Sequence, residues 1–296
     1  MMDEKRVVSG QSRVTHHPSP ITHHLFLAAA ILWISTAVAL GDRPPSAWGL
    51  SPSAMGTEPV PIEISGKDGA PMLLVPAGEF TMGHEKWDAD EKPVHRVYLD
   101  AFSMDKYEVT TARYATYMQE TGREQPAQWK DVNPATDGER PVVGVSWHDA
   151  DAYCRHYGKR LPTEAEWEKA VRGPDGRMFP WGNEEPTRLR ANFGATWTGY
   201  ETLMVVGSLE AGKSPYGIYD LAGNAWEWVA DWYDKDYYKS SPDRNPAGPS
   251  RGGSKVLRGG SWYHMLYDLR STNRNYFAPT KRQFDLSFRC VQDPPK

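Results

Sequence analysis

Residues 261–268 place a hydroxyl, an imidazole and a carboxylate within one short segment. Ser261 and His264 lie three residues apart, and Tyr267 and Asp268 follow them. A ring nitrogen near a carboxylate can bind iron or transfer a proton. An iron site of two histidines and one carboxylate needs a second histidine. The candidates for that ligand are His84, His95, His148 and His156. The alternative is a histidine that only packs and forms hydrogen bonds.

A second segment places carboxylates around a turn. Asp220 and Glu227 flank Gly223 and Ala225. Calcium takes about six to eight oxygen ligands, and a turn can add backbone carbonyls to side-chain carboxylates. The pattern predicts a calcium site, with a turn of solvated acids as the alternative.

The N-terminus predicts export. Basic residues precede an apolar run over 25–40, and Ala37, Val38 and Ala39 give the small residues that a signal peptidase accepts. The run is shorter than the ~20 residues of a spanning helix, so we interpret 1–39 as a signal peptide, with a short N-terminal anchor as the alternative. Residues 40–70 are rich in Pro, Ser and Gly and are predicted to be a flexible linker.

An exported protein would be periplasmic or secreted, with no membrane contact after cleavage of the signal. Because such compartments are oxidising, we expect the two cysteines, Cys154 and Cys290, to be paired; a reactive thiol beside Arg289 is the alternative. The net charge of -4 argues against a nucleic-acid partner. The 12 Trp residues indicate a fold held by aromatic packing. Most of those in the motif regions are expected to pack in the core, and Trp226 and Trp262 are best placed to stack on a ligand.

Regular elements are predicted mainly in the first half of the chain after the linker. Alternating apolar residues predict two strands over 72–76 and 80–82, and a second pair over 95–99 and 102–104. Capping residues predict three helices, which cover 111–120, 146–157 and 163–173. From 174 to 295 the sequence predicts turns and short strands, which a metal ion or a disulfide would have to stabilise. The expected class is α+β, rich in loops.

Several motifs resemble, in order, the family of the formylglycine-generating enzyme, also called sulfatase-modifying factor. The longest are Gly-Lys-Arg-Leu-Pro-Thr-Glu-Ala-Glu-Trp at 158–167 and Leu-Ala-Gly-Asn-Ala-Trp-Glu-Trp at 221–228. Further matches lie at 80–83, 108–110, 141–154, 256–262 and 288–290. The resemblance implies one domain over 71–293 with a modified C-type-lectin-like fold.

The resemblance also implies ligands and a disulfide. A first calcium site would use the side chains of Asp220 and Glu227 with the carbonyls of Gly223 and Ala225. A second would use Asn192 and the carbonyls of Phe193 and Tyr200, but its acidic ligand falls on Thr198, with Glu201 as a substitute. The family's structural disulfide would join Cys154 to Cys290.

The family's enzymes bind copper(I) through two thiolates five residues apart, and those positions hold His264 and Leu269 here. Formylglycine generation is therefore not expected, although Ser261, Trp226 and Arg258 match residues of the family's cleft. We expect a calcium-stabilised module that binds an exported protein or peptide, or assists its maturation. The alternative is a divergent oxidoreductase resembling the exported pyoverdine-maturation relatives, with His264, Asp268 or Glu227 as base and copper or iron left open.

Overall fold

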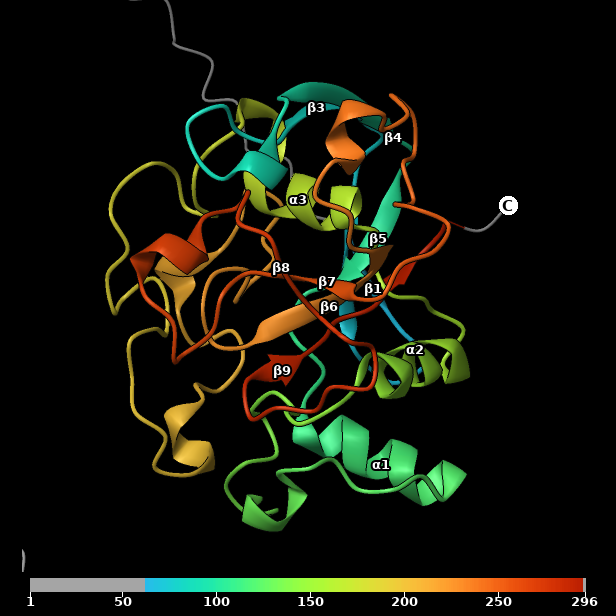
Figure 1. Cartoon of the computed structure of the whole chain (residues 1–296). Coiled ribbons are helices and arrows are strands. Elements are labelled where there is room, and N and C mark those ends of the chain that lie inside the picture. Colours follow the sequence, from blue (N-terminus) through green and yellow to red (C-terminus); the bar gives the residue numbers. More distant parts are fainter. Residues whose placement is uncertain (1–61, 295–296) are drawn as a thin grey trace, which may run out of the picture. The chain divides into compact units, whose positions relative to one another are not determined.

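The computed structural model describes residues 62–294, which form three sheets of short strands and three α-helices (Figure 1). The strands are β1 (Glu63–Ser65), β2 (Pro71–Val75), β3 (Gly78–Met82), β4 (His95–Leu99), β5 (Phe102–Asp105), β6 (Trp226–Trp232), β7 (Lys255–Arg258), β8 (Asn275–Phe277), β9 (Leu286–Ser287) and β10 (Val291–Gln292). The helices are α1 (Thr111–Thr121), α2 (Trp147–His156) and α3 (Glu164–Arg172). The predicted loop-rich α+β class is confirmed.

The predicted signal peptide (1–39) and residues 40–61 of the predicted linker lie outside the described residues. Residues 62–70 correct the linker's C-terminal boundary, because they belong to the folded domain. Here β1 pairs antiparallel with β2, with Ile64 opposite Met72. The Asp68 carboxylate then anchors the following turn, since it lies 2.6 Å from the buried Lys159 ammonium. The sequence did not predict this part of the domain, because a three-residue strand and one ion pair produce no periodic pattern of apolar residues.

The four predicted N-terminal strands are confirmed, but their pairing differs from the predicted pairs. β2 pairs with β5, with Leu73 opposite Met104, and β3 pairs with β4, with Phe80 opposite Val97. The first sheet therefore has the order β1-β2-β5-β10, and β3-β4 form a separate pair. Alternation of apolar residues predicts a strand but not its partner, because the partner is chosen by packing across the core.

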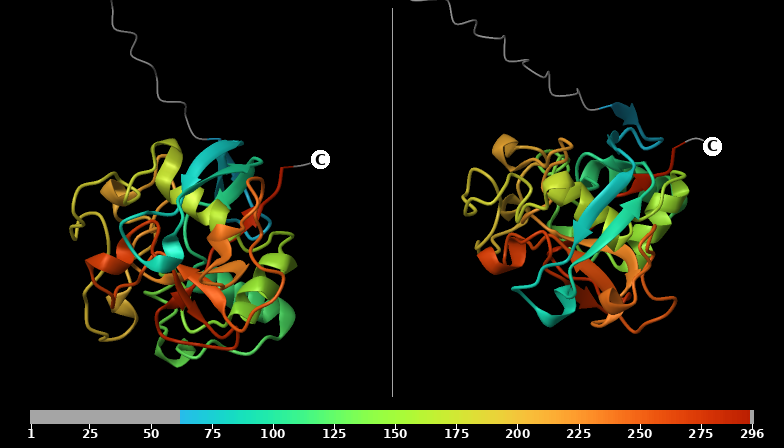
Figure 2. Two further views of the ribbon diagram at one scale, coloured as in Figure 1. Left: turned by 45° about the horizontal axis from the view of Figure 1, so that its top comes forward. Right: turned by 90° about the horizontal axis from the view of Figure 1, so that it is seen from above.

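The three predicted helices are confirmed, and side chains cap each of them. Thr110 caps α1, while Ser146 and Thr163 form capping boxes with Asp149 and Glu166. Helix α3 lies between the β3-β4 pair and the third sheet (Figures 1 and 2). All nine of its residues are buried, so it forms the centre of the domain rather than a surface helix.

The third sheet, of order β8-β7-β6-β9, brings distant segments together. Strands β6 and β9 are parallel, with Trp226 opposite Leu286. Strand β7 ends at Arg258, and the loop 259–274 returns to β8. The start of β6, the end of β7 and the start of β9 therefore meet at one place.

Large aromatic residues fill the core, as the sequence predicted. Trp167, Trp226, Trp228 and Trp262 are each at most 1% exposed. Trp226 and Trp262 thus have no free ring face, which corrects their predicted role as ligand-stacking platforms. Among residues 62–294, no helix combines the length and the apolar character needed to cross a membrane.

Candidate functional site

Four polar side chains meet where β6, β7 and β9 converge, and we call Trp226, Ser261, His264 and Asp285 the Ser261 cluster. Ser261 Oγ lies 2.8 Å from His264 Nδ1 and 2.9 Å from Asp285 Oδ2. Trp226 Nε1 lies 3.2 Å from the same Nδ1 atom. Trp226, Ser261 and Asp285 are at most 1% exposed, whereas the His264 side chain is 26% exposed. The cluster therefore reaches solvent through the His264 ring.

The backbone holds these side chains in place. The Trp226 amide donates to the Asp285 carbonyl at 2.8 Å, which ties β6 to β9. Gly259 and Gly260 precede Ser261 and have φ of 99° and 77°, a region that favours glycine. A Cβ atom on Gly260 would lie 2.8 Å from Leu269 Cδ2, so the turn into Ser261 requires glycine there.

Asp285 is the acid that contacts His264, and the sequence analysis had not singled it out. The predicted acid, Asp268, lies in the 3-10 helix Leu266–Leu269, and Arg270 follows that helix. Burial raises the pKa of Asp285, while the Ser261 hydrogen bond and the nearby His264 act in the opposite direction. The sequence feature that could have indicated Asp285 is its position as a lone carboxylate within the apolar run 284–288.

The four other candidate histidines have other surroundings. His156 Nε2 lies 2.9 Å from Glu120, His95 packs against Tyr238, and His148 packs against Trp147. His84 accepts a hydrogen bond from the Lys86 amide. Across the described range 62–294, no group of three or more His, Cys, Asp or Glu side chains is arranged to hold a metal ion. The geometry gives His264 no second histidine for an iron site.

His264 and Leu269, which the family resemblance predicts at the thiolate positions, have different surroundings. His264 belongs to the Ser261 cluster, whereas Leu269 is fully buried in an apolar cluster with Phe179, Ala191 and Ala222. Arg258, a predicted cleft residue, is fully buried in an ion pair with Glu168 at 2.6 Å.

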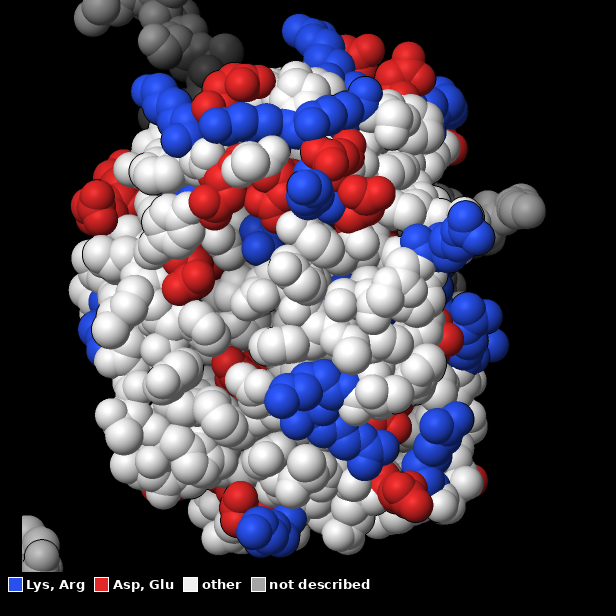
Figure 3. All heavy atoms as spheres, in the orientation of Figure 1, with Lys and Arg blue, Asp and Glu red and all other residues white. Residues whose placement is uncertain are grey.

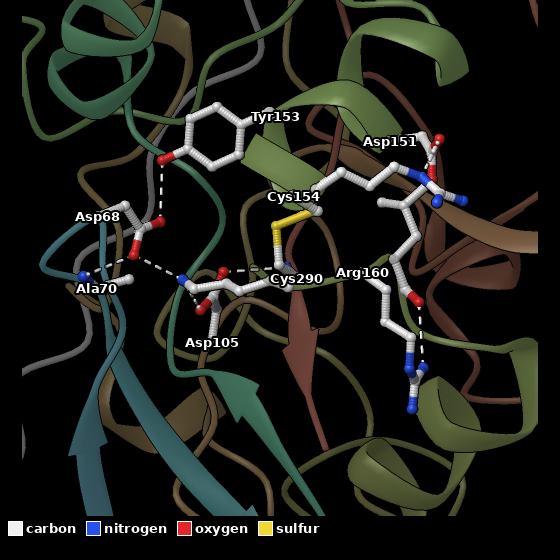
Figure 4. The surroundings of a disulfide bond; sticks show 11 residues. Asp68, Ala70, Asp105, Asp151, Tyr153, Cys154, Arg160 and Cys290 are labelled. Carbon is white, nitrogen blue, oxygen red and sulfur yellow. Dashed lines mark hydrogen bonds and ion pairs between the residues drawn. A yellow bond between two sulfur atoms is a disulfide. The ribbon is translucent and has the colours of Figure 1, made fainter. Parts of the chain in front are cut away.

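Both cysteines of the chain form one disulfide, as predicted (Figure 4). Cys154 of α2 and Cys290 have a Cα–Cα distance of 5.7 Å and are fully buried among α1, α2, β6 and β9. The buried Lys159 lies nearby and pairs with Asp68 and Asp105. The disulfide fixes Cys290 to α2, and the ion pair joins Lys159, which follows α2, to β5 and to the turn at Asp68.

The predicted calcium segment contains an excess of buried negative charge. Glu227 forms a two-pronged ion pair with the buried Arg289, with a shortest distance of 2.6 Å, and accepts a hydrogen bond from Trp167. The buried Glu108 accepts hydrogen bonds from Asn224 and the Ala225 amide.

Asp220 accepts a hydrogen bond from the Gly207 amide. Burial, followed by repulsion from Asp220 and Glu227, raises the pKa of Glu108. Burial also raises the pKa of Asp220 to about 6, and Glu227 adds to that effect. Three buried carboxylates thus face one guanidinium, which is an arrangement that a cation would balance.

This raised pKa predicts a pH dependence of stability in calcium-free protein. The folded-state pKa of Asp220 is about 6 against 3.8 for the free side chain, so the folded state holds the proton more tightly. The stabilising effect is complete below pH 3.8 and is lost as the pH rises through about 6. Urea unfolding at several pH values should show that the free energy of unfolding falls as the pH rises through this range. The variant Asp220→Asn should lack that part of the pH dependence. If the free energy of unfolding depends on pH equally in both proteins, the role of Asp220 is disproved.

At the predicted second calcium site, the neutral groups form hydrogen bonds or pack within the domain. The Asn192 amide nitrogen donates to the Thr202 carbonyl and to Asn224 Oδ1, and the Tyr200 carbonyl accepts from the Leu203 amide. Phe193 packs with Phe179 and Leu269, while Glu201 is exposed. The second calcium site therefore stays a prediction, because its acidic candidate, Glu201, is not buried.

Apolar side chains next to His264 reach solvent. Tyr263, Met265, Leu266 and Tyr267 are between 42% and 68% exposed. In Figure 3 the left and lower-left surface, from the 3-10 helix Leu266–Leu269 downward, carries few charged side chains, whereas acids and bases alternate along the upper edge. The Ser261 cluster therefore opens beside a weakly charged surface.

Comparison with known proteins agrees with this architecture. Residues 61–294 match the family model "Sulfatase-modifying factor enzyme 1-like domain". The formylglycine-generating enzyme of Streptomyces coelicolor is 36% identical, with 75% of this chain and 88% of that protein covered. This chain belongs to the sulfatase-modifying factor family.

Two further proteins that are similar to this chain are not named as formylglycine-generating enzymes. The serine/threonine-protein kinase pkn1 of Chlamydia pneumoniae is 36% identical over 75% of this chain, but the match spans only 38% of that protein's length. The structure of PvdO from Pseudomonas aeruginosa has a TM-score of 0.68 and 28% identity, with 79% of this chain and 98% of that chain covered. The similarity thus extends over the folded domain.

Proposed function

We propose that this chain is an exported, calcium-stabilised domain that binds a protein or peptide, or assists its maturation, without copper–thiolate chemistry. One observation carries the proposal: both cysteines of the chain are joined in a disulfide, so the described domain holds no free thiol. The resemblance to the family assigns the two thiolate positions to His264 and the buried Leu269, which supports the same proposal. Copper(I) and its oxygen chemistry need soft thiolate ligands. The domain has kept the family's architecture and lacks those ligands.

Two features support export and a macromolecular partner. A buried disulfide suits an oxidising compartment, where it persists. The exposed Tyr263, Met265 and Tyr267 offer apolar area beside the His264 ring, which is typical of surfaces that contact a peptide or protein.

Calcium is proposed to bind the Asp220 segment, and the chemistry of the donors fits that ion. Asp220 and Glu227 would supply carboxylate oxygens, and Gly223 and Ala225 would supply carbonyls. The divalent charge would balance the carboxylates that Arg289 alone leaves in excess. The role of the ion is structural: it holds the turn that leads into β6.

Calcium should therefore raise the melting temperature. At about 100 times its dissociation constant it should add about 2.7 kcal/mol, which corresponds to roughly 5–10 °C for a domain of this size. Scanning calorimetry with calcium and with a chelator measures the shift. Asp220→Asn should abolish it, and the exposed Asp175→Asn serves as the matched control that keeps it. An equal calcium response in Asp220→Asn would rule out this site.

A divergent oxidoreductase is the second candidate, because the Ser261 cluster combines a buried acid, a hydroxyl and a solvent-reaching imidazole. Elemental analysis of the purified full chain separates the two candidates. Calcium without redox metal, together with no substrate turnover, supports the binding module. Iron or copper at about one per chain, with turnover, supports the oxidoreductase and overturns the first proposal.

A further inference from the structure

The Ser261 cluster contains a hydrogen-bond donor that cannot accept, and this fixes the other protons. An indole nitrogen donates only, and Trp226 Nε1 lies 3.2 Å from His264 Nδ1. Trp226 is 1% exposed, so water cannot replace this acceptor. In this geometry His264 Nδ1 is the acceptor for the Trp226 indole N–H, and a neutral ring then carries its proton on Nε2.

The same count of hydrogens assigns Ser261 and Asp285. Ser261 has one hydrogen and lies between two potential acceptors, His264 Nδ1 at 2.8 Å and Asp285 Oδ2 at 2.9 Å. If that hydrogen pointed to Asp285, two lone pairs would face each other across the 2.8 Å contact. A proton on Asp285 removes the conflict: Asp285 donates to Ser261, and Ser261 donates to Nδ1, where the shorter Ser261 contact and the longer Trp226 contact share one lone pair.

The protonated state of Asp285 agrees with its surroundings. The side chain is fully buried, and its Oδ1 atom has no hydrogen-bond partner. An ionised carboxylate would be costly there, and burial raises the pKa of this group. The side chains that act on its pKa by hydrogen bonding, Ser261 and Gln283, are neutral. His264 is also neutral in this arrangement, and among residues 62–294 no Lys or Arg forms an ion pair with Asp285.

We propose that Trp226, Ser261 and a protonated Asp285 lock His264 in its Nε2–H form, so that the cleft presents a neutral N–H donor to an oxygen acceptor such as a peptide carbonyl. The inference rests on the proposed binding role of the cleft and adds the chemical group that it recognises. At the position of a family thiolate, this chain has a hydrogen-bond donor. Trp226 and Asp285 act as positioning residues for His264.

Nitrogen-15 NMR of histidine-labelled full chain tests the lock directly. The signals of the His264 ring, assigned by their loss in His264→Gln, should show a protonated Nε2 and an unprotonated Nδ1. In a second measurement, the carboxyl carbon of Asp285 should have the chemical shift of the acid form at neutral pH. Trp226→Phe keeps the ring but removes the donor, so the Nδ1–H form should appear. Trp228→Phe is the matched control, because it lies on the same strand and donates elsewhere, to the Val145 carbonyl.

A protonated Nδ1 with a bare Nε2 in the wild type, or an ionised Asp285, would overturn the lock. Recognition of an oxygen is tested with N-methylacetamide, which should perturb His264 Nε2 more than the ring of the exposed His148. Equal perturbation would overturn that part of the inference. Neither result depends on the metal content and turnover that test the proposed function, so the two failures are distinguishable.

Discussion

Reduction of the Cys154–Cys290 disulfide should lower the melting temperature by roughly 10–20 °C. The two cysteines are 136 residues apart, and closing a loop of this length stabilises the folded state by about 5 kcal/mol, chiefly by restricting the unfolded chain. For a domain of this size, each kcal/mol corresponds to about 2–4 °C. Because both sulfurs are fully buried, reduction should require partial unfolding.

The measurement is thermal unfolding with and without a phosphine reductant after equilibration in mild denaturant. The double variant Cys154→Ala/Cys290→Ala should melt at the lower temperature and should not respond to the reductant. Wild-type protein whose melting temperature is unchanged after complete reduction would show that the disulfide does not stabilise the fold.

Replacement of Arg289 by Met should strongly destabilise the fold. Arg289 and Glu227 are buried, with a shortest distance of 2.6 Å. Removing the guanidinium would leave Glu227 unpaired next to Glu108 and Asp220, and breaking one side of a buried pair costs about 3–5 kcal/mol. Calcium should restore part of this loss, because it would balance the same carboxylates.

Chemical denaturation with and without calcium measures the effect of Arg289→Met. Arg96→Met is the control, because the Arg96–Glu79 pair has the similar distance of 2.9 Å but its side chains are 80% and 58% exposed. That variant should unfold at the same denaturant concentration as the wild type. If both variants behave alike, the charge balance described for the Asp220 segment is wrong.

The helices could be predicted from the sequence, because the residues that cap a helix lie next to it in the chain. Ser146 and Thr163 begin α2 and α3 as capping residues, and both helices lie within a residue or two of their predicted bounds. The pairing of β2 with β5 could not be predicted, since many antiparallel arrangements satisfy the same alternation of residues. The disulfide is predicted by the expected oxidising compartment and by the resemblance, not by the spacing of the two cysteines.

The candidate site was predicted only in part for a similar reason. Ser261, His264 and Trp226 belong to recognisable motifs, and the structure brings them together. Asp285 lies 24 residues from Ser261 and reaches it through the parallel pairing of β6 with β9. No local pattern indicates that pairing, so the nearer Asp268 was chosen as the acid.

The most direct test of the central claim is a turnover assay with copper(I), oxygen and a Cys-x-Pro-x-Arg peptide, read by mass spectrometry. A formylglycine-generating enzyme of the same family serves as the positive control. Because both cysteines are held in the buried disulfide, and the proposed thiolate positions hold His264 and Leu269, the account predicts an unmodified peptide. Formation of the aldehyde product by this chain would contradict the account.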